Sequence, residues 1–464
     1  MHPKVLLIQP NYNIKKDAKI WTANPPLGPC YIAAVLEKSR IGVEILDTNT
    51  KNLSVRETLR IIKEKNPAYV GFSILTPAAD WCVAVARRLP KTMISVAGGP
   101  HTSGLPETMV RKGFDIAVIG EGEQTMLEIA KGYAWEKING IVFKKNGKLI
   151  RTPARIPLDP NTIPFPARHL IEKGGTDKPY LSAGTVYYPW AQLFSSRGCP
   201  YNCYFCNKNI FGYRYRPRTP QDIIREIDFL VKTYGVKEID IYDDNFNFDM
   251  KRAEKILDLI IRKKYTLCLR FSNGIRADKV SVRLLRKMKK AGTQYIAYGV
   301  ETGDETVLAK IPKGETLNEI RRAVALTNKA GIPVTGFFIF GLIGDTRETM
   351  QHTIDFAVTT GFDRTIINIA TPYPGTRMWN MITGGGGKIF IKRWKDFHQT
   401  SGRMLYTMPG TADPTTVESM YRKAYRAFYF RPAYIARQIP NMLRPGILPV
   451  MLRGVGRILF SQNN

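Results

Sequence analysis

The sequence has 464 residues, of which 44% are apolar and only six are cysteine. That length exceeds one typical domain, and so few cysteines exclude a disulfide-rich secreted scaffold, so we expect a multi-domain protein of the reducing cytoplasm. The formal net charge of +30 favours anionic partners, either nucleic acid or an anionic membrane face, but charge alone does not distinguish these from a merely solvated basic surface.

Strand-like apolar segments alternate with helical patterns over the first part of the chain. This alternation predicts a doubly wound parallel sheet, whose ligands bind beyond the carboxyl ends of the strands. Glycines, which let a ligand approach the backbone closely, gather at those predicted ends. The expected strands are residues 4–9, 43–46, 69–73, 94–97 and 116–119, and the glycines are Gly98, Gly99, Gly120 and Gly122.

The pattern changes after residue 132, where we place the first domain boundary. Residues 141–143 and 148–150 flank Asn146-Gly147, which is typical of a β-hairpin. Prolines at high density between residues 153 and 166 then indicate an extended connector that reaches residue 190.

The most informative stretch is residues 195–206, in which Cys199, Cys203 and Cys206 have the spacing C-x3-C-x2-C. Three thiolates on one tight loop can bind three irons of a cubane cluster, which normally takes four cysteines. No fourth cysteine lies nearby in the sequence, so one iron is left open for a non-protein ligand and for chemistry. A structural zinc loop is the alternative, but it usually pairs two C-x2-C knuckles, and neither a second knuckle nor a neighbouring histidine is present.

This spacing is the signature of the radical S-adenosylmethionine (SAM) enzymes, which the stretch resembles closely. The resemblance implies that the three cysteines hold a 4Fe–4S cluster, that SAM chelates the fourth iron, and that an electron from the cluster cleaves SAM to methionine and a 5′-deoxyadenosyl radical. It also implies an electron donor such as flavodoxin or ferredoxin. Six further strand patterns resemble the partial (β/α)6 barrel of this family, in which reactive groups gather at the carboxyl ends of the strands. These strands are residues 191–196, 238–242, 267–272, 294–300, 333–340 and 365–370, with helices near 220–234, 250–263, 279–291, 316–330 and 346–360.

By the same resemblance, several side chains at the ends of the barrel strands would bind SAM. Asp243 and Asp244 stand where many members have G-G-E for the amino group of SAM, and the structural alternative is a helix cap before Met250. Glu301 would contact SAM, with a salt bridge inside the barrel as its alternative. The other implied cofactor contacts are Phe205, Asn273 and Phe340.

Residues 1–132 resemble the cobalamin-binding domain attached to many radical SAM enzymes. Ser73-Ile74-Leu75 fits the S-x-L motif, whose hydroxyl meets the nucleotide tail of cobalamin, and Gly98-Gly99 fits the G-G motif. The motif Gly120-Glu121-Gly122-Glu123 is typical of the radical SAM subset. The loop after the first strand lacks D-x-H-x-x-G, so we expect cobalamin without a histidine ligand; the alternative is a vestigial domain that only docks substrate. We expect His101 to form hydrogen bonds within its turn rather than to bind cobalt.

The C-terminal region, residues 378–464, contains a glycine joint at residues 384–387 and a helical pattern over residues 414–435. Its last part, residues 417–464, has eight lysine or arginine residues against one acid, Glu418, interleaved with aromatic and aliphatic residues. Such a segment either lies on an anionic membrane or packs as a helix over the open side of the barrel, and the pattern does not separate the two.

The sequence therefore predicts an α/β protein with a doubly wound Rossmann-like cobalamin-binding domain (1–132), a hairpin and proline-rich linker (133–190), a partial radical SAM barrel (191–377) and a small, mostly helical C-terminal region (378–464). The predicted function is alkylation, most often methylation, of an unactivated carbon in an apolar or lipid-like substrate, in the cytoplasm or at the inner face of the membrane.

Three alternatives to this function remain. The first keeps the cofactors but leads to ring formation, ring contraction or oxidation. The second, tRNA methylthiolation, requires three further cluster cysteines in the N-terminal domain, where only Cys30 and Cys82 occur, so no nucleic-acid partner is expected. The third, a non-enzymatic cobalamin- or membrane-binding module, is disfavoured by the intact cysteine loop.

Overall fold

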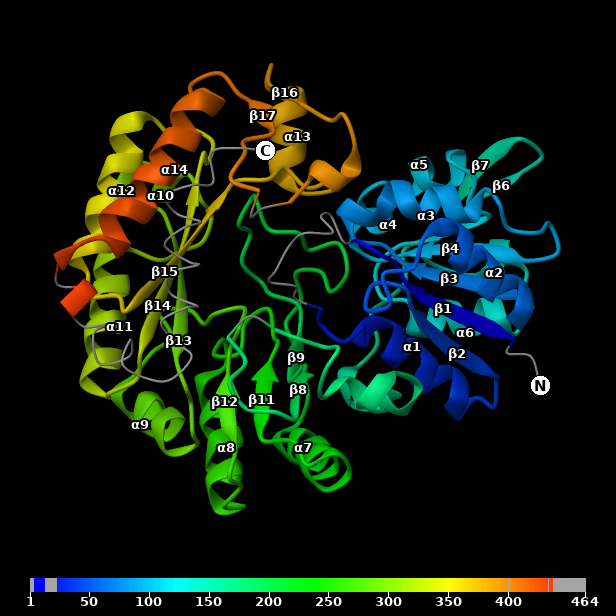
Figure 1. Cartoon of the computed structure of the whole chain (residues 1–464), viewed down its shortest axis with the longest axis horizontal. Coiled ribbons are helices and arrows are strands. Elements are labelled where there is room, and N and C mark those ends of the chain that lie inside the picture. The colour runs from blue at the N-terminus through cyan, green and yellow to red at the C-terminus, as the bar shows by residue number, and fades with distance from the viewer. Residues whose placement is uncertain (1–3, 13–22, 183, 399–400, 433, 437–464) are drawn as a thin grey trace.

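The computed structural model describes residues 4–12, 23–182, 184–398, 401–432 and 434–436. It shows an α/β protein in which an N-terminal domain, on the right in Figure 1, lies beside a partial barrel on the left. No helix within the described ranges is both long and apolar enough to cross a membrane.

The N-terminal domain contains a seven-stranded sheet in the order β2-β1-β3-β4-β5-β6-β7, whose first five strands are parallel. The sheet confirms the doubly wound arrangement predicted from the alternating pattern. Its strands are β1 (Val5–Gln9), β2 (Val43–Asp47), β3 (Tyr69–Ser73), β4 (Ile94–Gly98), β5 (Ile116–Val118), β6 (Ile141–Lys145) and β7 (Lys148–Arg151), and its helices are α1 (Leu27–Lys38), α2 (Val55–Lys65), α3 (Ala79–Ala86), α4 (Pro100–Gly104), α5 (Pro106–Arg111) and α6 (Glu123–Ala130).

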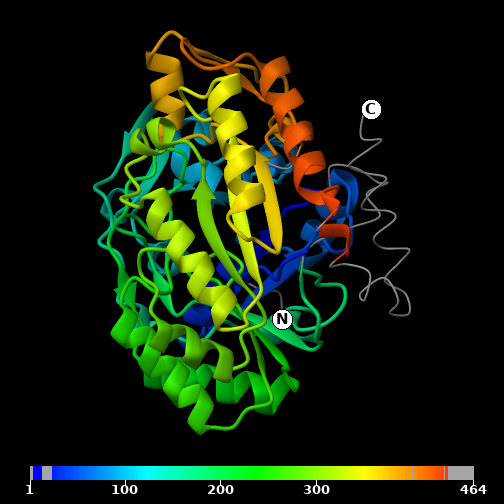
Figure 2. The same ribbon diagram turned by 90° about the vertical axis from the view of Figure 1, so that its left-hand side faces the viewer.

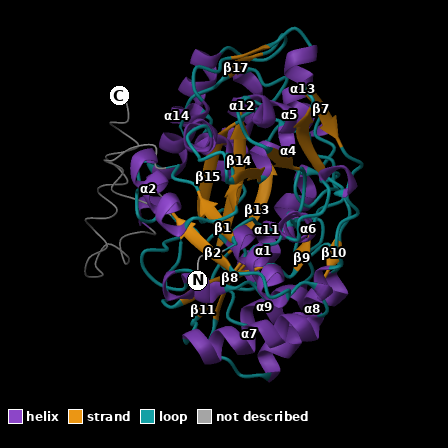
Figure 3. Cartoon of the chain, turned by 90° about the vertical axis from the view of Figure 1, so that its right-hand side faces the viewer, coloured by secondary structure: helices purple, strands orange, loops and turns teal. Residues whose placement is uncertain are grey.

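Helices cover both faces of this sheet (Figure 3). Successive residues of a strand point to opposite faces, and β1 is apolar on both faces from Val5 to Ile8. Val5 and Leu7 pack with α1 and α6, whereas Leu6 and Ile8 pack with α2, α3 and α5. A strand buried on both sides therefore reads as the continuous apolar run seen in the sequence.

The hairpin of β6 and β7 belongs to the N-terminal sheet. β6 pairs antiparallel with β5, and β7 pairs antiparallel with β6. The domain boundary expected from the sequence, between residues 132 and 133, placed this hairpin in the linker. A hairpin pattern in a sequence does not reveal which sheet the hairpin joins. We propose a boundary after Arg151 instead.

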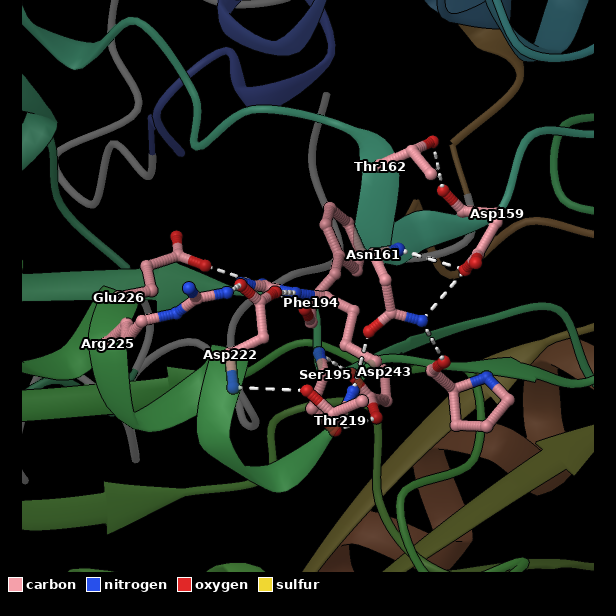
Figure 4. A network of polar contacts seen from close by, with 12 residues as sticks. Asp159, Asn161, Thr162, Phe194, Ser195, Thr219, Asp222, Arg225, Glu226 and Asp243 are labelled. Atoms are coloured by element: carbon pink, nitrogen blue, oxygen red, sulfur yellow. Dashed lines mark hydrogen bonds and ion pairs between the residues drawn. The ribbon is translucent and has the colours of Figure 1, made fainter.

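The connector that follows contains three short 3-10 helices, η3 (Pro160–Thr162), η4 (Arg168–Leu170) and η5 (Glu172–Gly175). Asn161 attaches it to the barrel (Figure 4): its side-chain oxygen accepts from the Thr219 N–H at 2.7 Å, and its amide nitrogen donates to the Pro217 carbonyl at 3.2 Å. Thr219 in turn caps α7 by accepting from the Asp222 N–H. The connector thus fixes the first helix of the barrel.

The barrel has six parallel strands that follow one another in chain order. Their hydrogen bonds form two three-stranded sheets, and the parallel bridges Leu269–Thr293 and Ile275–Tyr298 join these sheets. Each predicted strand and helix is found within a few residues of its expected place. The strands are β8 (Trp190–Leu193), β11 (Glu238–Ile241), β12 (Cys268–Arg270), β13 (Ile296–Glu301), β14 (Val334–Phe340) and β15 (Arg364–Ile369), and the helices are α7 (Pro220–Tyr234), α8 (Met250–Arg262), α9 (Val282–Lys290), α10 (Glu305–Ala309), α11 (Leu317–Lys329) and α12 (Arg347–Thr359).

The C-terminal region contacts both of the larger parts. Its described residues contain α13 (Arg377–Gly384), β16 (Lys388–Ile389), η6 (Trp394–Asp396), β17 (Tyr406–Thr407) and α14 (Pro414–Tyr429). Trp394 and Phe397 pack into the core of the N-terminal domain, whereas α14 lies beside α12 on the barrel (Figure 2).

Helix α14 covers the edge strand β15. The Tyr425 hydroxyl accepts from the Ile367 N–H at 3.2 Å and donates to the Ile367 carbonyl at 3.1 Å. The Tyr429 hydroxyl does the same for Thr365, at 3.2 and 2.7 Å. Of the two alternatives for this region, residues 414–429 adopt the packed helix; residues 437–464 of the basic segment lie outside the described residues.

Candidate functional site

The three cysteines lie on a loop that a short antiparallel pair holds in place. β9 (Ser196–Arg197) pairs with β10 (Arg216–Pro217) immediately before Cys199. Gly198 has a φ of +80°, and a Cβ there would lie 2.3 Å from the Arg214 carbonyl oxygen, so this turn requires glycine. The Cys206 N–H donates to the Cys203 carbonyl at 3.1 Å, which closes the turn that carries the last two thiols.

The surroundings of the thiols fit a 4Fe–4S cluster. Burial raises the pKa of Cys203 to about 11 and that of Cys206 to about 12, while the lysine charges of Lys208 and Lys313 oppose this rise. These cations compensate the negative charge that thiolate ligation brings, because a metal-bound cysteine is deprotonated. Within the described ranges no three His, Cys, Asp or Glu side chains converge on a single ion; in a cubane each thiolate binds a different iron.

The two adjacent carboxylates after β11 have different surroundings. Asp243 is buried and accepts from the Ser195 N–H at 2.6 Å (Figure 4). It also accepts from the Ser196 hydroxyl at 2.6 Å. Asp244 accepts from the Gly198 N–H at 3.1 Å and remains accessible beside the cysteine loop. The protein packed around Asp244 raises the pKa of its carboxyl group, and the positive charge of Lys208 opposes the rise. The helix cap that was their structural alternative is Asp249, which accepts from the Arg252 N–H.

Two other predicted SAM contacts form internal interactions. The Asn273 amide donates to the carbonyls of Tyr242 and Asp243, at 3.1 and 3.2 Å, so it braces the loop that carries Asp244. Glu301 has a φ of +69° at a bulge of β13, which is a strained conformation for a side chain of this type. Its carboxylate lies 2.8 Å from the Lys313 ammonium, so the salt bridge considered as its alternative is present.

The two predicted aromatic contacts lie in the barrel core or at its rim. Phe340 is buried in β14. Phe205 is half-buried, with its ring edge-on to Tyr204 at a centroid distance of 5.6 Å. The ring of Phe205, between the second and third cysteines, is therefore partly accessible, whereas the ring of Phe340 packs in the core of the barrel.

A cavity of about 380 Å³ lies between the carboxyl ends of the N-terminal strands and the barrel. A Cβ on Gly99, whose φ is +92°, would lie 2.6 Å from the Ile74 nitrogen, so the strand end needs glycine to make this wall. The predicted residues that line it are Ser73, Leu75, Gly98, Gly99, Gly120, Glu121 and Gly122, and the barrel adds Gln192, Phe194, Arg197 and Tyr242.

The composition of the cavity wall suits part of a large ligand with amide groups, such as cobalamin. Its wall is largely apolar and includes an open glycine-lined edge, which accommodates a broad flat ring. Gln192 lines this wall, and its buried amide nitrogen has no hydrogen-bond partner among the described residues. A buried donor of this kind is costly unless a ligand satisfies it.

His101 lies away from the cavity wall. It is buried, its Nδ1 is 3.3 Å from the Thr76 hydroxyl, and its ring is edge-on to Trp394 at 4.7 Å. Burial lowers the pKa of His101 to about 4. The contact with Thr76 agrees with the expectation of a local hydrogen bond. That His101 does not bind cobalt stays a prediction.

The acidic residues of the Gly120–Glu123 motif form ion pairs with the barrel. Glu121 and Glu123 each lie 2.7 Å from the Arg197 guanidinium, and Glu121 also pairs with Arg216. Glu121, expected as a cofactor contact, thus lines the cavity while its carboxylate is held by two arginines.

Several residues of this site were missed in the sequence. Residues 25–29 are rich in proline and glycine and carried no functional signal, yet all five line the cavity. Lys208 and Lys313 could have been found only by a weak signal: Lys208 is a cation close to the cysteine loop in the sequence, and Lys313 is a cation that follows Glu301. Arg197 and Gln192 carried none, because their roles depend on the packing of two domains. The missed residues are Pro25–Pro29, Gln192, Arg197, Lys208, Tyr242 and Lys313.

Comparison with known proteins agrees with both halves of this site. The Radical SAM superfamily matches residues 193–357, and the B12 binding domain family matches residues 18–130. In fold, the chain is similar to the solved structure of the radical SAM methyltransferase TsrM from Kitasatospora setae with cobalamin and a 4Fe–4S cluster bound, with a TM-score of 0.70, 18% identity, and coverage of 93% of this chain and 90% of that one.

Relatives in sequence extend over nearly the whole chain. An uncharacterised methyltransferase of Pyrococcus horikoshii is 32% identical over 99% of both chains. The cytidylyl-2-hydroxyethylphosphonate methyltransferase of Streptomyces wedmorensis is 27% identical over 93% of this chain and 90% of its own. The anaerobic magnesium-protoporphyrin IX monomethyl ester cyclase of Rubrivivax gelatinosus is 25% identical over 93% of this chain and 78% of its own. The chain therefore belongs to the cobalamin-dependent, methyltransferase-like radical SAM enzymes, with a 4Fe–4S cluster, SAM and cobalamin as its cofactors.

Proposed function

We propose that the protein methylates an unactivated carbon of a small-molecule substrate. The observation that carries the proposal is that one cavity is lined both by the glycine-rich strand ends of the N-terminal domain and by Arg197, two residues before Cys199. Cobalamin in this cavity would then lie beside the cluster loop. When bound, these groups supply reductive cleavage of SAM and methyl transfer.

The chain's own residues would bind and orient the reactants. We assign cluster ligation to Cys199, Cys203 and Cys206, and the amino group of SAM to Asp244, whose carboxylate is accessible beside them. Glu301 is held by Lys313 at the end of β13, where it would meet the remainder of SAM. Phe205 would pack against the adenine. An external one-electron donor such as flavodoxin or ferredoxin would reduce the cluster.

The test is an assay of anaerobically purified, cluster-reconstituted protein with SAM whose methyl group carries deuterium. We expect 5′-deoxyadenosine from the wild type and none from Cys203→Ala, because the variant lacks one cluster ligand. Cys268→Ala, which removes a half-buried thiol of β12, serves as the matched control and should retain activity. Wild-type amounts of 5′-deoxyadenosine from Cys203→Ala would contradict the cluster assignment.

A ring-forming reaction is the second candidate, because a relative 25% identical over 93% of this chain is a cyclase. The deuterated methyl group separates the two outcomes. Methylation moves the label into the product, whereas ring formation or oxidation leaves the product unlabelled while 5′-deoxyadenosine still forms.

We further propose that the substrate is apolar or derived from a membrane. The support is the segment of residues 388–395, which is exposed apart from the half-buried Ile389 and the buried Trp394. In it Lys388, Lys392, Arg393 and Lys395 surround Phe390 and Ile391, whose exposed fractions are 47% and 40%. Basic and apolar residues together favour contact with anionic lipid. Adding a lipid extract to the assay should increase 5′-deoxyadenosine formation; a soluble metabolite fraction that does so in its place would contradict this substrate class.

A further inference from the structure

One arginine joins the N-terminal domain to the cluster loop. Arg197 Nη1 lies 2.7 Å from Glu121 Oε2, and Arg197 Nη2 lies 2.7 Å from Glu123 Oε1. Glu121 follows β5 and Glu123 begins α6, whereas Arg197 ends β9, two residues before Cys199. All three side chains are at least nine-tenths buried.

Two aromatic rings also contact the guanidinium of Arg197. Its carbon lies 4.9 Å from the centre of the Tyr31 ring and 5.1 Å from that of Phe211. Tyr31 comes from α1 of the N-terminal domain, and Phe211 from the segment that follows the cysteines; both line the cavity. Arg216 makes a second pair with Glu121 and donates to the Phe211 carbonyl at 3.3 Å.

This arrangement is sensitive to small displacements. A planar guanidinium pairs two carboxylates in a fixed fork geometry, which a lysine does not reproduce. Buried ion pairs give little net stability, but separating them leaves uncompensated charges in the interior and is strongly unfavourable. A shift of the cavity wall relative to the cysteine loop would therefore have to carry Arg197 with it.

We propose that Arg197 is a positioning residue that couples the cobalamin cavity to the cluster loop, so that each cofactor binds more tightly when the other is in place. The inference rests on the cofactor sites of the proposed function. When the N-terminal domain shifts, the ion pairs with Glu121 and Glu123 would move Arg197 with it. Because Arg197 is two residues before Cys199, the backbone would then move the cysteine loop. Coupling between two sites is reciprocal and is measured as a ratio of affinities.

The experiment measures the dissociation constant of hydroxocobalamin by absorbance, for full-length protein with its cluster reconstituted and after iron removal by a chelator. In the wild type we expect the cluster to tighten cobalamin binding by at least about fivefold. In Glu123→Gln and in Arg197→Lys this ratio should fall below about twofold. Each ratio compares a variant with itself, so a general loss of stability that weakens both measurements does not change it.

Glu128→Gln is the matched control. Glu128 lies on the same helix α6 and pairs with Arg155 of the connector at 3.1 Å, away from the cluster loop. It should retain the wild-type ratio. A wild-type ratio near one, or an unchanged ratio in both variants, would overturn the inference; if Glu123→Gln does not fold, Arg197→Lys, which keeps the charge, decides. Failure of every form to bind hydroxocobalamin would instead refute the cobalamin site, and the inference with it.

Discussion

At the scale of single residues, Asp243 and Asp244 show how position gives two identical side chains different tasks. Asp243 lies two residues after the end of β11 and points to the start of the cysteine loop, where Ser195 and Ser196 donate to it. Asp244, one residue further, accepts a hydrogen bond only from the Gly198 N–H among the described residues, and it remains accessible beside the cysteine loop. The first carboxylate supports the loop, and the second remains available to a ligand.

We therefore expect opposite results for their asparagine variants. Asp243→Asn loses charge-assisted hydrogen bonds in the interior and should lower the free energy of unfolding by about 2 kcal/mol. Asp244→Asn should change stability by less than about 0.5 kcal/mol but weaken SAM binding by about tenfold or more. Thermal unfolding and isothermal titration with SAM measure the two effects. Equal SAM affinity of Asp244→Asn and the wild type would remove Asp244 from the SAM site.

His101 should make stability depend on pH. Its pKa is about 4 in the folded protein and about 6.5 when unfolded, so between these values the unfolded chain binds a proton that the folded protein excludes. Stability is therefore fully present above pH 6.5 and falls as the pH drops toward 4. Since one unit of pKa is about 1.4 kcal/mol, the full loss from this residue is about 3 kcal/mol.

The variant His101→Phe keeps a flat ring beside Trp394 and removes the titrating group. Urea unfolding at pH 7, 6, 5 and 4.5 should show a shallower decline for the variant than for the wild type. Parallel declines would show that His101 does not contribute to the pH dependence. The same variant should bind hydroxocobalamin as the wild type does, because His101 is not part of the cavity wall.

The sequence identified residues whose role depends on local spacing or on a backbone requirement. The three cysteines share one short loop, and Gly99 occupies a strand end that rejects a Cβ, so both signals are local. Arg197 and Gln192 were not predictable, because each acquires its role when two distant parts of the chain meet. The arginine partners of Glu121 were not predictable for the same reason, because they are 76 and 95 residues away in the chain.

At the scale of elements, α14 acts as the partner that β15 lacks in the sheet. An edge strand presents unpaired N–H and C=O groups, and two tyrosine hydroxyls of α14 each satisfy both groups of one residue, Ile367 or Thr365. The helical pattern of residues 414–435 was visible in the sequence, but its apolar face did not reveal whether protein or lipid covers it. Tyrosine hydroxyls at the strand's own backbone groups favour protein for α14.

Removing these hydroxyls should uncover the edge. Tyr425→Phe and Tyr429→Phe should each lower the free energy of unfolding by about 1–3 kcal/mol, because the strand's polar groups lose their partner. Tyr434→Phe is the control, since no hydrogen bond of its hydroxyl is found in the described part of the chain and its ring packs on Tyr429. Chemical unfolding measures the three variants, and gel filtration reports association through the bare strand. Equal stability of all three would contradict this role of α14.

At the scale of the whole molecule, the packing of α14 separates two parts of the basic C-terminal segment. Residues up to 429 belong to the barrel, so a truncation after Thr416 would damage the fold and confound any binding assay. A truncation after Ala436 leaves α14 intact and removes four arginines and no acid. The truncation after Ala436 and variants of residues 388–395 can therefore test separately how each region contributes to lipid binding.

We expect the full-length protein to sediment with anionic liposomes and this binding to weaken, but not vanish, as salt increases. The truncation after Ala436 and the double variant Phe390→Ala/Ile391→Ala should each bind less. The control is Val186→Ala/Tyr187→Ala, an apolar pair before β8 that is somewhat more exposed, at 55% and 53%. Full binding by the truncation and the double variant, or none by the wild type, would contradict the membrane contact, and loss of nearly all binding with salt would indicate a nucleic-acid partner instead.

Because α14 shields β15 but follows it in the chain, β15 is synthesised before its shield. Ribosomes add about 5–20 residues per second, and α14 begins at Pro414, well after β15 ends at Ile369. The last strand of the barrel therefore leaves the ribosome seconds before the helix that shields it. During that interval the nascent chain exposes a bare strand edge, which makes the final part of translation the period in which this protein most needs protection from association with its neighbours.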